Sequence, residues 1–233
     1  MRMLLGAVVL VLASGTAVAQ SLPPQAGASS QAEVSFEFTR PGLAVPHFVL
    51  RVREDGSATY QAEEAPVSSG RYGSVQPVTS AGAGTKVDRS LMVSPATTSA
   101  IFKAARSLNH FNLDCASKAK NIADTGKKVL TYSGPDGGGS CTYNYSENKS
   151  VSQVAETFQA IAYTLDEGRR LDFLHRYDRL GLDAEMENLT HEYEEKRAIE
   201  IPAIAPTLTS LVKDDALMER VRKRASHLLE VSQ

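Results

Sequence analysis

The chain has 233 residues, with 25 basic and 27 acidic side chains and therefore a formal net charge of −2 at pH 7. This balance argues against nucleic acid as a partner, because nucleic-acid binding requires a clearly basic surface. The length is sufficient for one large domain or two small ones, and the chain has two cysteines and no tryptophan.

Residues 1–19 have the pattern of a signal peptide. Arg2 precedes an apolar run at 4–13, and Ala17-Val18-Ala19 supplies a small-x-small cleavage pattern. The run is too short for a spanning helix, so a retained membrane anchor is the less favoured alternative. We therefore expect a mature chain that begins at Gln20, has no membrane span, and is exported to the periplasm or the extracellular space.

The first half of the mature chain predicts strands. Residues 20–32 are expected to be a flexible linker, since proline, glycine, serine and glutamine occur there without apolar periodicity. Alternating apolar residues then predict strands at 34–38 and 47–53, and Asp55-Gly56 predicts a hairpin turn before a return strand at 58–60. Residues 63–86 have the composition of an irregular loop, either a binding loop or, as we favour, a disordered insertion. Another strand is predicted at 87–93.

Two amphipathic helices are predicted next. The first begins at Ser94-Pro95, where serine can cap the helix and proline suits its first turn, and it ends near Asn109. The second begins with a capping box of Ser150 and Gln153 and carries an apolar stripe to Leu165.

Both cysteines lie between these helices, in the stretch 111–145 around which we expect the fold to be organised. Strand patterns at 127–132 and 140–145 flank a glycine-rich turn at 134–139. An even cysteine count in an exported protein predicts a disulfide, so Cys115 and Cys141 should staple the base of this hairpin. A redox-active pair is less favoured, because catalytic cysteines usually lie close in sequence.

From Asp166 the composition changes, because glycine, serine and β-branched residues become scarce. Short amphipathic helices are predicted at 167–180, 184–199, 203–212 and 216–231, with Asp183 and Asp215 as caps. The expected fold class is α+β. A two-layer sandwich of a mainly antiparallel sheet with two packed helices should occupy residues 33–165, and an α-helical C-terminal region residues 166–233.

The order of these elements resembles that of small exported bacterial domains of unknown function. The residues that carry the resemblance are those of the strand at 34–38, the hairpin around Asp55-Gly56, the helix end at 101–111, Asp124 before the second hairpin, and the helix at 151–165. The resemblance covers residues 33–165 and implies a two-layer α+β sandwich but no activity. Residues 203–231 are similar to one helix pair of a HEAT-type repeat; with no second copy, we expect a helical hairpin.

No stretch has the spacing of a catalytic, phosphate-binding or metal-binding motif, so we predict no catalytic, cofactor-binding or metal residues. The five histidines, His47, His110, His175, His191 and His227, are isolated in the sequence. Glu187, His191 and Glu195 share one predicted helix face and could hold a metal, but a solvated polar face is favoured. Asp172 and His175 receive the same interpretation.

Two groups of residues could contribute to binding. Arg220, Arg222, Lys223 and Arg224 could contact an acidic partner or a lipid headgroup, although a solvated helix face is favoured. Tyr132, Tyr143 and Tyr145 could form an interface on the second hairpin, although a core or sheet-surface role is favoured.

Missing catalytic motifs and amphipathic C-terminal helices, which could bind a protein partner or a second copy of the chain, favour a non-catalytic binding or interaction module. One alternative is a hydrolase-type enzyme whose site is assembled by the fold, with His175 or His191 meeting a carboxylate or a hydroxyl in a cleft. Another is an envelope structural protein or an inhibitor, which the sequence does not separate from the first interpretation.

Overall fold

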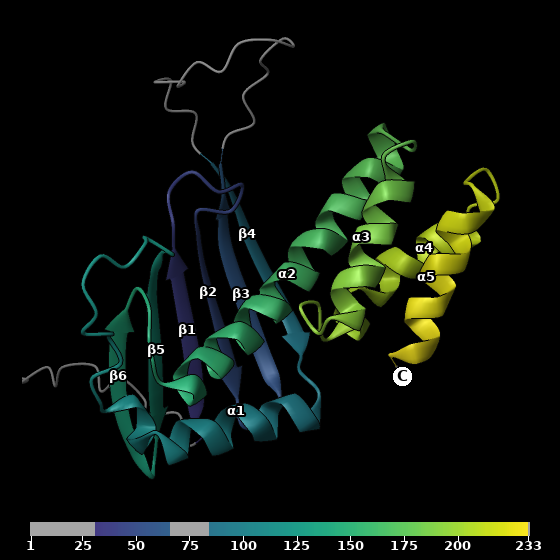
Figure 1. Ribbon diagram of the computed structural model, residues 1–233. Coiled ribbons are helices and arrows are strands. Elements are labelled where there is room, and N and C mark those ends of the chain that lie inside the picture. Colours follow the sequence, from purple (N-terminus) through teal and green to yellow (C-terminus); the bar gives the residue numbers. More distant parts are fainter. Residues whose placement is uncertain (1–30, 66–83, 233) are drawn as a thin grey trace, which may run out of the picture.

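The computed structural model describes residues 31–65 and 84–232, and its fold is α+β with a helical C-terminal region (Figure 1). The predicted fold class is therefore confirmed. The predicted signal peptide and cleavage site, nearly all of the predicted linker, and most of the predicted loop at 63–86 lie outside the described residues.

One antiparallel six-stranded sheet has the order β4-β3-β2-β1-β5-β6. Its strands are β1 (Glu33–Thr39), β2 (His47–Arg53), β3 (Ser57–Glu64), β4 (Thr85–Met92), β5 (Lys127–Gly134) and β6 (Gly137–Tyr143). The predicted hairpin through Asp55-Gly56 joins β2 and β3, and Gly56 takes the positive φ of 84° that the tight turn requires. β1 also pairs with β5, which follows it only after β2, β3, β4 and two helical segments.

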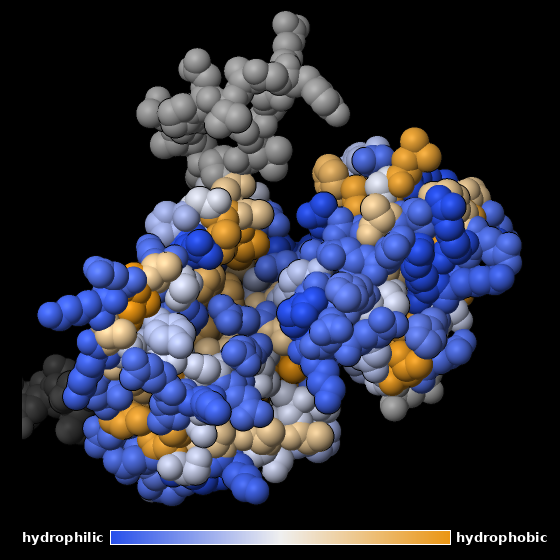
Figure 2. All heavy atoms as spheres, in the orientation of Figure 1, coloured by the Kyte–Doolittle hydropathy of each residue, from blue (hydrophilic) through white to orange (hydrophobic). Residues whose placement is uncertain are grey.

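The apolar face of the sheet is covered by two helices, α1 (Pro95–Ser107) and α2 (Lys149–Tyr177), which lie on the same side of it (Figure 1). Alternate residues of the strands point to this face, as the period of two requires. The buried residues are Val34, Phe36, Phe38, Phe48, Leu50, Val52, Ala58, Tyr60, Ala62, Leu130, Tyr132, Cys141 and Tyr143. The surface over α2 and α3 is mostly hydrophilic in the same view (Figure 2).

The turn of the second hairpin is shorter than predicted. Only Pro135 and Asp136 connect the strands, and the glycines from Gly137 to Gly139 belong to β6. A side chain at Gly139 would lie 2.5 Å from the carbonyl oxygen of His110. These glycines thus let the 3-10 helix η1 (Asn109–Phe111) pass close against β6.

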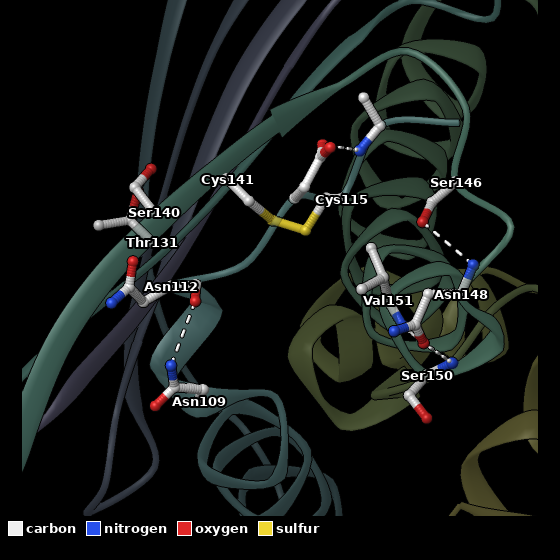
Figure 3. The surroundings of a disulfide bond; sticks show 12 residues. Asn109, Asn112, Cys115, Thr131, Ser140, Cys141, Ser146, Asn148, Ser150 and Val151 are labelled. Atoms are coloured by element: carbon white, nitrogen blue, oxygen red, sulfur yellow. Dashed lines mark hydrogen bonds between the residues drawn. A yellow bond between two sulfur atoms is a disulfide. The ribbon is translucent and has the colours of Figure 1, made fainter. Parts of the chain in front are cut away.

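Helix α2 is a single helix of 29 residues, so the predicted helix break near Asp166 is wrong. The predicted capping box at Ser150 is wrong as well. The side chain of Asn148 caps the helix instead, and it accepts hydrogen bonds from the backbone N–H groups of Ser150 and Val151 (Figure 3). In contrast, Ser94 caps α1 as predicted.

The C-terminal region contains α3 (Leu182–Glu194), the 3-10 helix η2 (Ile201–Ile204), α4 (Ala205–Lys213) and α5 (Glu219–Val231). Their apolar residues form a second core with the C-terminal half of α2. This core contains Leu171, Leu182, Met186, Leu189, Ala198, Ile201, Ile204, Leu208, Leu211, Leu217, Val221, Ala225 and Leu228. The predicted caps at Asp183 and Asp215 are wrong, since α3 and α5 begin after Gly181 and Met218 without a side-chain cap.

The two cysteines lie at bonding distance, as predicted, with 5.8 Å between their Cα atoms (Figure 3). Cys115 lies in the connection between η1 and β5 rather than in a strand. The disulfide therefore joins this connection to β6 instead of closing the base of the hairpin. Of the hairpin tyrosines, Tyr132 and Tyr143 are buried in the core, and only Tyr145 is exposed.

Candidate functional site

A groove of about 750 Å³ runs along the exposed side of α1. The β2–β3 turn, the junction between β4 and α1, and η2 complete its walls. The lining residues are Glu54, Asp55, Gly56, Met92, Val93, Ser94, Pro95, Thr98, Ser99, Phe102, Lys103, Arg106, Glu200 and Pro202. A concave, largely apolar site with a few polar groups is the usual form of a binding site in a protein without a known ligand.

The groove exists because the β2–β3 turn packs tightly against the start of α1. The backbone N–H of Val93 donates to the carbonyl oxygen of Gly56 at 2.8 Å. A side chain at Gly56 would lie 2.8 Å from the carbonyl oxygen of Val93, so only glycine allows this approach. Met92 is 64% exposed beside this junction. Its flexible thioether chain can adapt to apolar groups of different shape.

Arg106 closes one end of the groove and is held in place by two carboxylates. It donates to Glu54 and Asp136 at 2.8 Å each, and its guanidinium lies over the rings of Phe102 and Tyr132. The Tyr132 hydroxyl and Arg106 lower the pKa of Asp136 well below its usual range. Arg106 is therefore already neutralised inside the protein.

Glu200 closes the other end and caps α1 from outside the helix. Its carboxylate accepts hydrogen bonds from the backbone N–H of Ser94 at 2.8 Å and from the Ser94 hydroxyl at 2.7 Å. The hydroxyl of Thr97 donates to it at 2.5 Å. A carboxylate is stabilised at a helix N-terminus, so Glu200 is satisfied by these groups.

Lys103 is the groove cation that has no carboxylate partner in the part of the chain that the structure describes. Within the described ranges 31–65 and 84–232 it has neither an ion pair nor a hydrogen bond. Asp55, the remaining carboxylate of the groove, accepts from the backbone N–H and the hydroxyl of Ser57. The groove lining therefore carries three carboxylates and two cations, of which Lys103 is the cation with no carboxylate partner in the described ranges.

A second cluster lies in the helical region, around His175. Its Nε2 is 2.9 Å from the Asp214 carboxylate, and its Nδ1 is 3.4 Å from the Ser210 hydroxyl. Arg179 lies 3.3 Å from the same carboxylate. The hydrogen bond with His175 and that from the backbone N–H of Ala216 lower the pKa of Asp214. Thus α2, α4 and the α4–α5 turn bring a serine, a histidine and an aspartate together.

The His175 cluster lacks the surroundings that acyl transfer requires. Ser210 belongs to the last turn of α4, where the helix presents carbonyl groups and the negative end of its dipole. An oxyanion needs backbone N–H donors or a positive charge. The nearby cation, Arg179, is engaged by Asp214. The cluster is therefore better explained as a structural contact that holds α2 against α4 than as an active site.

Other residues that the sequence singled out have partners elsewhere. The basic cluster on α5 pairs with acidic residues of α3, the α4–α5 turn and α5 itself: Arg220 with Asp183, Arg222 with Asp215, Lys223 with Glu219, and Arg224 with Asp183 and Glu187. His175 contacts Asp214 rather than Asp172. In the described part of the chain, no three histidine, cysteine or acidic side chains are placed to hold a metal ion.

Sequence reasoning missed a pair of buried carboxyl groups between α2 and α3. Glu167 faces Glu185, whose carboxylate is also held by Arg170 at 2.5 Å. Burial and the proximity of Glu185 raise the pKa of Glu167 to about 8. Its position could have indicated burial, since Thr164 and Leu171, three residues before and four after it, are buried on the same stripe.

Sequence reasoning also missed the polar contact between the sheet and the centre of α2. The Tyr60 hydroxyl donates to Asp166 at 2.7 Å, and Arg169 donates to Asp166 and Glu64. Burial raises the pKa of Asp166 despite these partners. The contact fixes α2 on β3 at the point where the first core ends.

Comparison with models of protein families and with curated proteins gave no match for this chain. In the described ranges, no helix has both the length and the apolar character needed to cross a membrane.

Proposed function

We propose that the protein is a non-catalytic binding module whose groove along α1 takes a protein segment carrying apolar side chains and a carboxylate. The observation that supports this proposal is the groove itself. Its lining is largely apolar and contains one cation, Lys103, that has no carboxylate partner in the described ranges. The carboxylates of Glu54, Asp55 and Glu200 are engaged by donors of the protein itself, which leaves Lys103 as the group that can pair with a carboxylate of the ligand.

The proposal is tested with fluorescein-labelled nonapeptides that pair apolar residues with aspartate or glutamate at each position. Fluorescence polarisation measures their binding to the chain that begins at Gln20. We expect Lys103→Glu to raise the dissociation constant of the acidic peptides at least tenfold, which corresponds to about 1.4 kcal/mol of binding free energy. We expect Met92→Asp to weaken all of them.

Lys120→Glu is the matched control, because Lys120 is exposed in the connection between η1 and β5, away from the groove. Both groove residues are exposed, so their variants should keep the thermal stability of the parent protein. Peptide binding that survives both groove substitutions, or no peptide bound below about 1 mM, would refute the proposal.

Export to an oxidising compartment is proposed together with this role. The predicted signal peptide and the disulfide between Cys115 and Cys141 support it, because disulfides persist outside the reducing cytosol. N-terminal sequencing of the protein recovered from the periplasm or medium should begin at Gln20. Recovery only from the cytosol, with both thiols free, would contradict export.

A hydrolase is the second candidate, and the His175 cluster is the observation that favours it. In that case Ser210 Oγ would attack an ester carbonyl carbon while Nδ1 of His175 takes its proton. A fluorophosphonate probe, which forms a bond to activated serine hydroxyls, distinguishes the candidates. Labelling that Ser210→Ala and His175→Gln abolish would establish an active serine, whereas an unlabelled wild-type protein would remove this candidate.

A further inference from the structure

Strand β4 forms an open edge of the sheet (Figure 1). It pairs with β3 along its whole length, and in the described ranges its backbone has no hydrogen bond to any other element. The opposite edge strand, β6, is covered by η1 and the connection that follows it. A side chain at Gly139 would lie 2.8 Å from the backbone nitrogen of Asn112, and the N–H of Ser117 donates to the carbonyl oxygen of Tyr145 at 2.9 Å. An uncovered edge such as β4 offers a row of unpaired N–H and C=O groups to another chain.

The backbone groups of β4 that face outward belong to every second residue. The N–H and C=O of one residue point to the same side of a strand, and this side alternates along the chain. The register places Val93 opposite Gly56, and the N–H of Val93 donates to the carbonyl oxygen of Gly56 at 2.8 Å. Val93 and every second residue before it therefore face β3. The residues whose backbone groups face away from β3 are Lys86, Asp88, Ser90 and Met92, and all four are exposed.

This row of outward backbone groups leads into the groove along α1. Met92 ends the row and lines the groove together with Pro202 of η2, so there is open space beside it. Ser90 and Met92 also line a hollow of about 410 Å³. The row from Lys86 to Met92 is about 20 Å long, which is within the reach of an extended nonapeptide. A segment that follows β4 in extended conformation therefore arrives at the groove.

We propose that the bound protein segment adds to the six-stranded sheet as a further strand, which pairs with the outward backbone groups of β4 and continues past Met92 into the groove. This inference rests on the proposed function and specifies how the segment is held. Backbone pairing supplies hydrogen bonds for any sequence, and pockets beside the edge select the side chains, here through the apolar lining and Lys103.

A single strand is the occupant that fits this edge. It needs only about 4.8 Å of space beside β4. The C-terminal helices lie beyond this edge of the sheet (Figure 1), so they leave less room for the whole sheet of a second copy.

N-methylation of the peptide backbone tests the pairing. The probe is the fluorescein-labelled nonapeptide that binds most tightly in the polarisation assay, made with a methyl group on one backbone nitrogen at a time. A methyl group removes the N–H donor, and only every second N–H of a strand faces its neighbour. We expect methylation to raise the dissociation constant at least tenfold at alternate positions and less than twofold at the positions between them.

Ser90→Pro makes the corresponding change in the protein. The N–H of Ser90 faces away from β3, and proline is tolerated on an edge strand where the N–H points to solvent. The variant should therefore keep the thermal midpoint of the parent protein and raise the dissociation constant of the unmethylated peptide at least tenfold. Ser90→Ala is the matched control, because it changes the same side chain but retains the N–H, and it should bind as the parent does.

The outcomes separate this inference from the proposed function. A peptide that binds, depends on Lys103 and tolerates methylation at every position would overturn the strand pairing and leave the proposed function in place. Equal losses in Ser90→Pro and Ser90→Ala would also overturn it, since the side chain would then make the contact. Absence of any bound peptide would refute both. If Ser90→Pro does not fold, the methylation pattern decides alone.

Discussion

Replacing Glu167 by glutamine should change how the stability of the protein depends on pH. Glu167 faces Glu185 on α3, and Tyr163, Asp166 and Arg170 surround it on α2. Its pKa is about 8 in the folded protein against 4.5 for an unperturbed glutamate, so the folded state keeps a proton that the unfolded state loses. Its stabilising contribution is full below pH 4.5 and is lost as the pH rises to 8.

The magnitude follows from the size of the shift. A rise of the pKa from 4.5 to about 8 would give about 5 kcal/mol, since each pKa unit corresponds to about 1.36 kcal/mol. Solvent at the edge of the site screens the carboxyl group, so we expect an effect of about 2 kcal/mol. A glutamine at this position is neutral at every pH and can still donate a hydrogen bond to Glu185. The free energy of unfolding of the variant should therefore exceed that of the wild type by less than about 1 kcal/mol near pH 5 and by about 2 kcal/mol at pH 8.5.

Urea denaturation at several pH values between 5 and 8.5, followed by circular dichroism, measures the effect. Glu156→Gln is the matched control, because Glu156 is an exposed glutamate on the same helix. The control should keep the pH dependence of the wild type. A Glu167→Gln variant that loses stability between pH 5 and 8.5 as steeply as the wild type would refute the reasoning.

Three further predictions concern contacts that hold the fold. Replacing Cys115 and Cys141 by serine should lower the free energy of unfolding by about 3.5 kcal/mol, since the bond joins residues 26 apart, and chemical denaturation measures it. Gly168→Ala should destabilise by about 1–3 kcal/mol in the same assay, because its new methyl group would overlap Ile204; an unchanged midpoint would contradict the packing. Glu200→Ala should lower the thermal midpoint through a loss of about 1–2 kcal/mol, because the backbone N–H of Ser94 and the hydroxyls of Ser94 and Thr97 lose their carboxylate acceptor.

Local sequence patterns correctly predicted the secondary-structure elements that a few neighbouring residues determine. The alternation in 47–53 predicted the bounds of β2, and Asp55-Gly56 predicted the turn that follows. Ser94 and Pro95 predicted the start of α1. In each case the deciding interaction spans no more than a few positions, and one sequence contains all of it.

The missed features depend on contacts between distant residues. The break predicted at Asp166 came from a change in composition, but the helix continues because Tyr60 and Arg169 hold Asp166, and Gly168 lets Ile204 pack closely. The contact between His175 and Asp214 spans 39 positions. No local spacing could show that these side chains meet.

The continuous α2 also decides how the binding proposals must be tested. Its N-terminal half completes the core on the sheet, and its C-terminal half completes the second core. Removing the chain after Leu165 would cut the helix, leave the Tyr60 hydroxyl without its acceptor, and remove Glu200 from the N-terminus of α1. Such a truncation would alter the groove and the sheet as well as remove the C-terminal region. Loss of binding would then not locate the binding surface, whereas exposed single substitutions such as Lys103→Glu leave both cores intact.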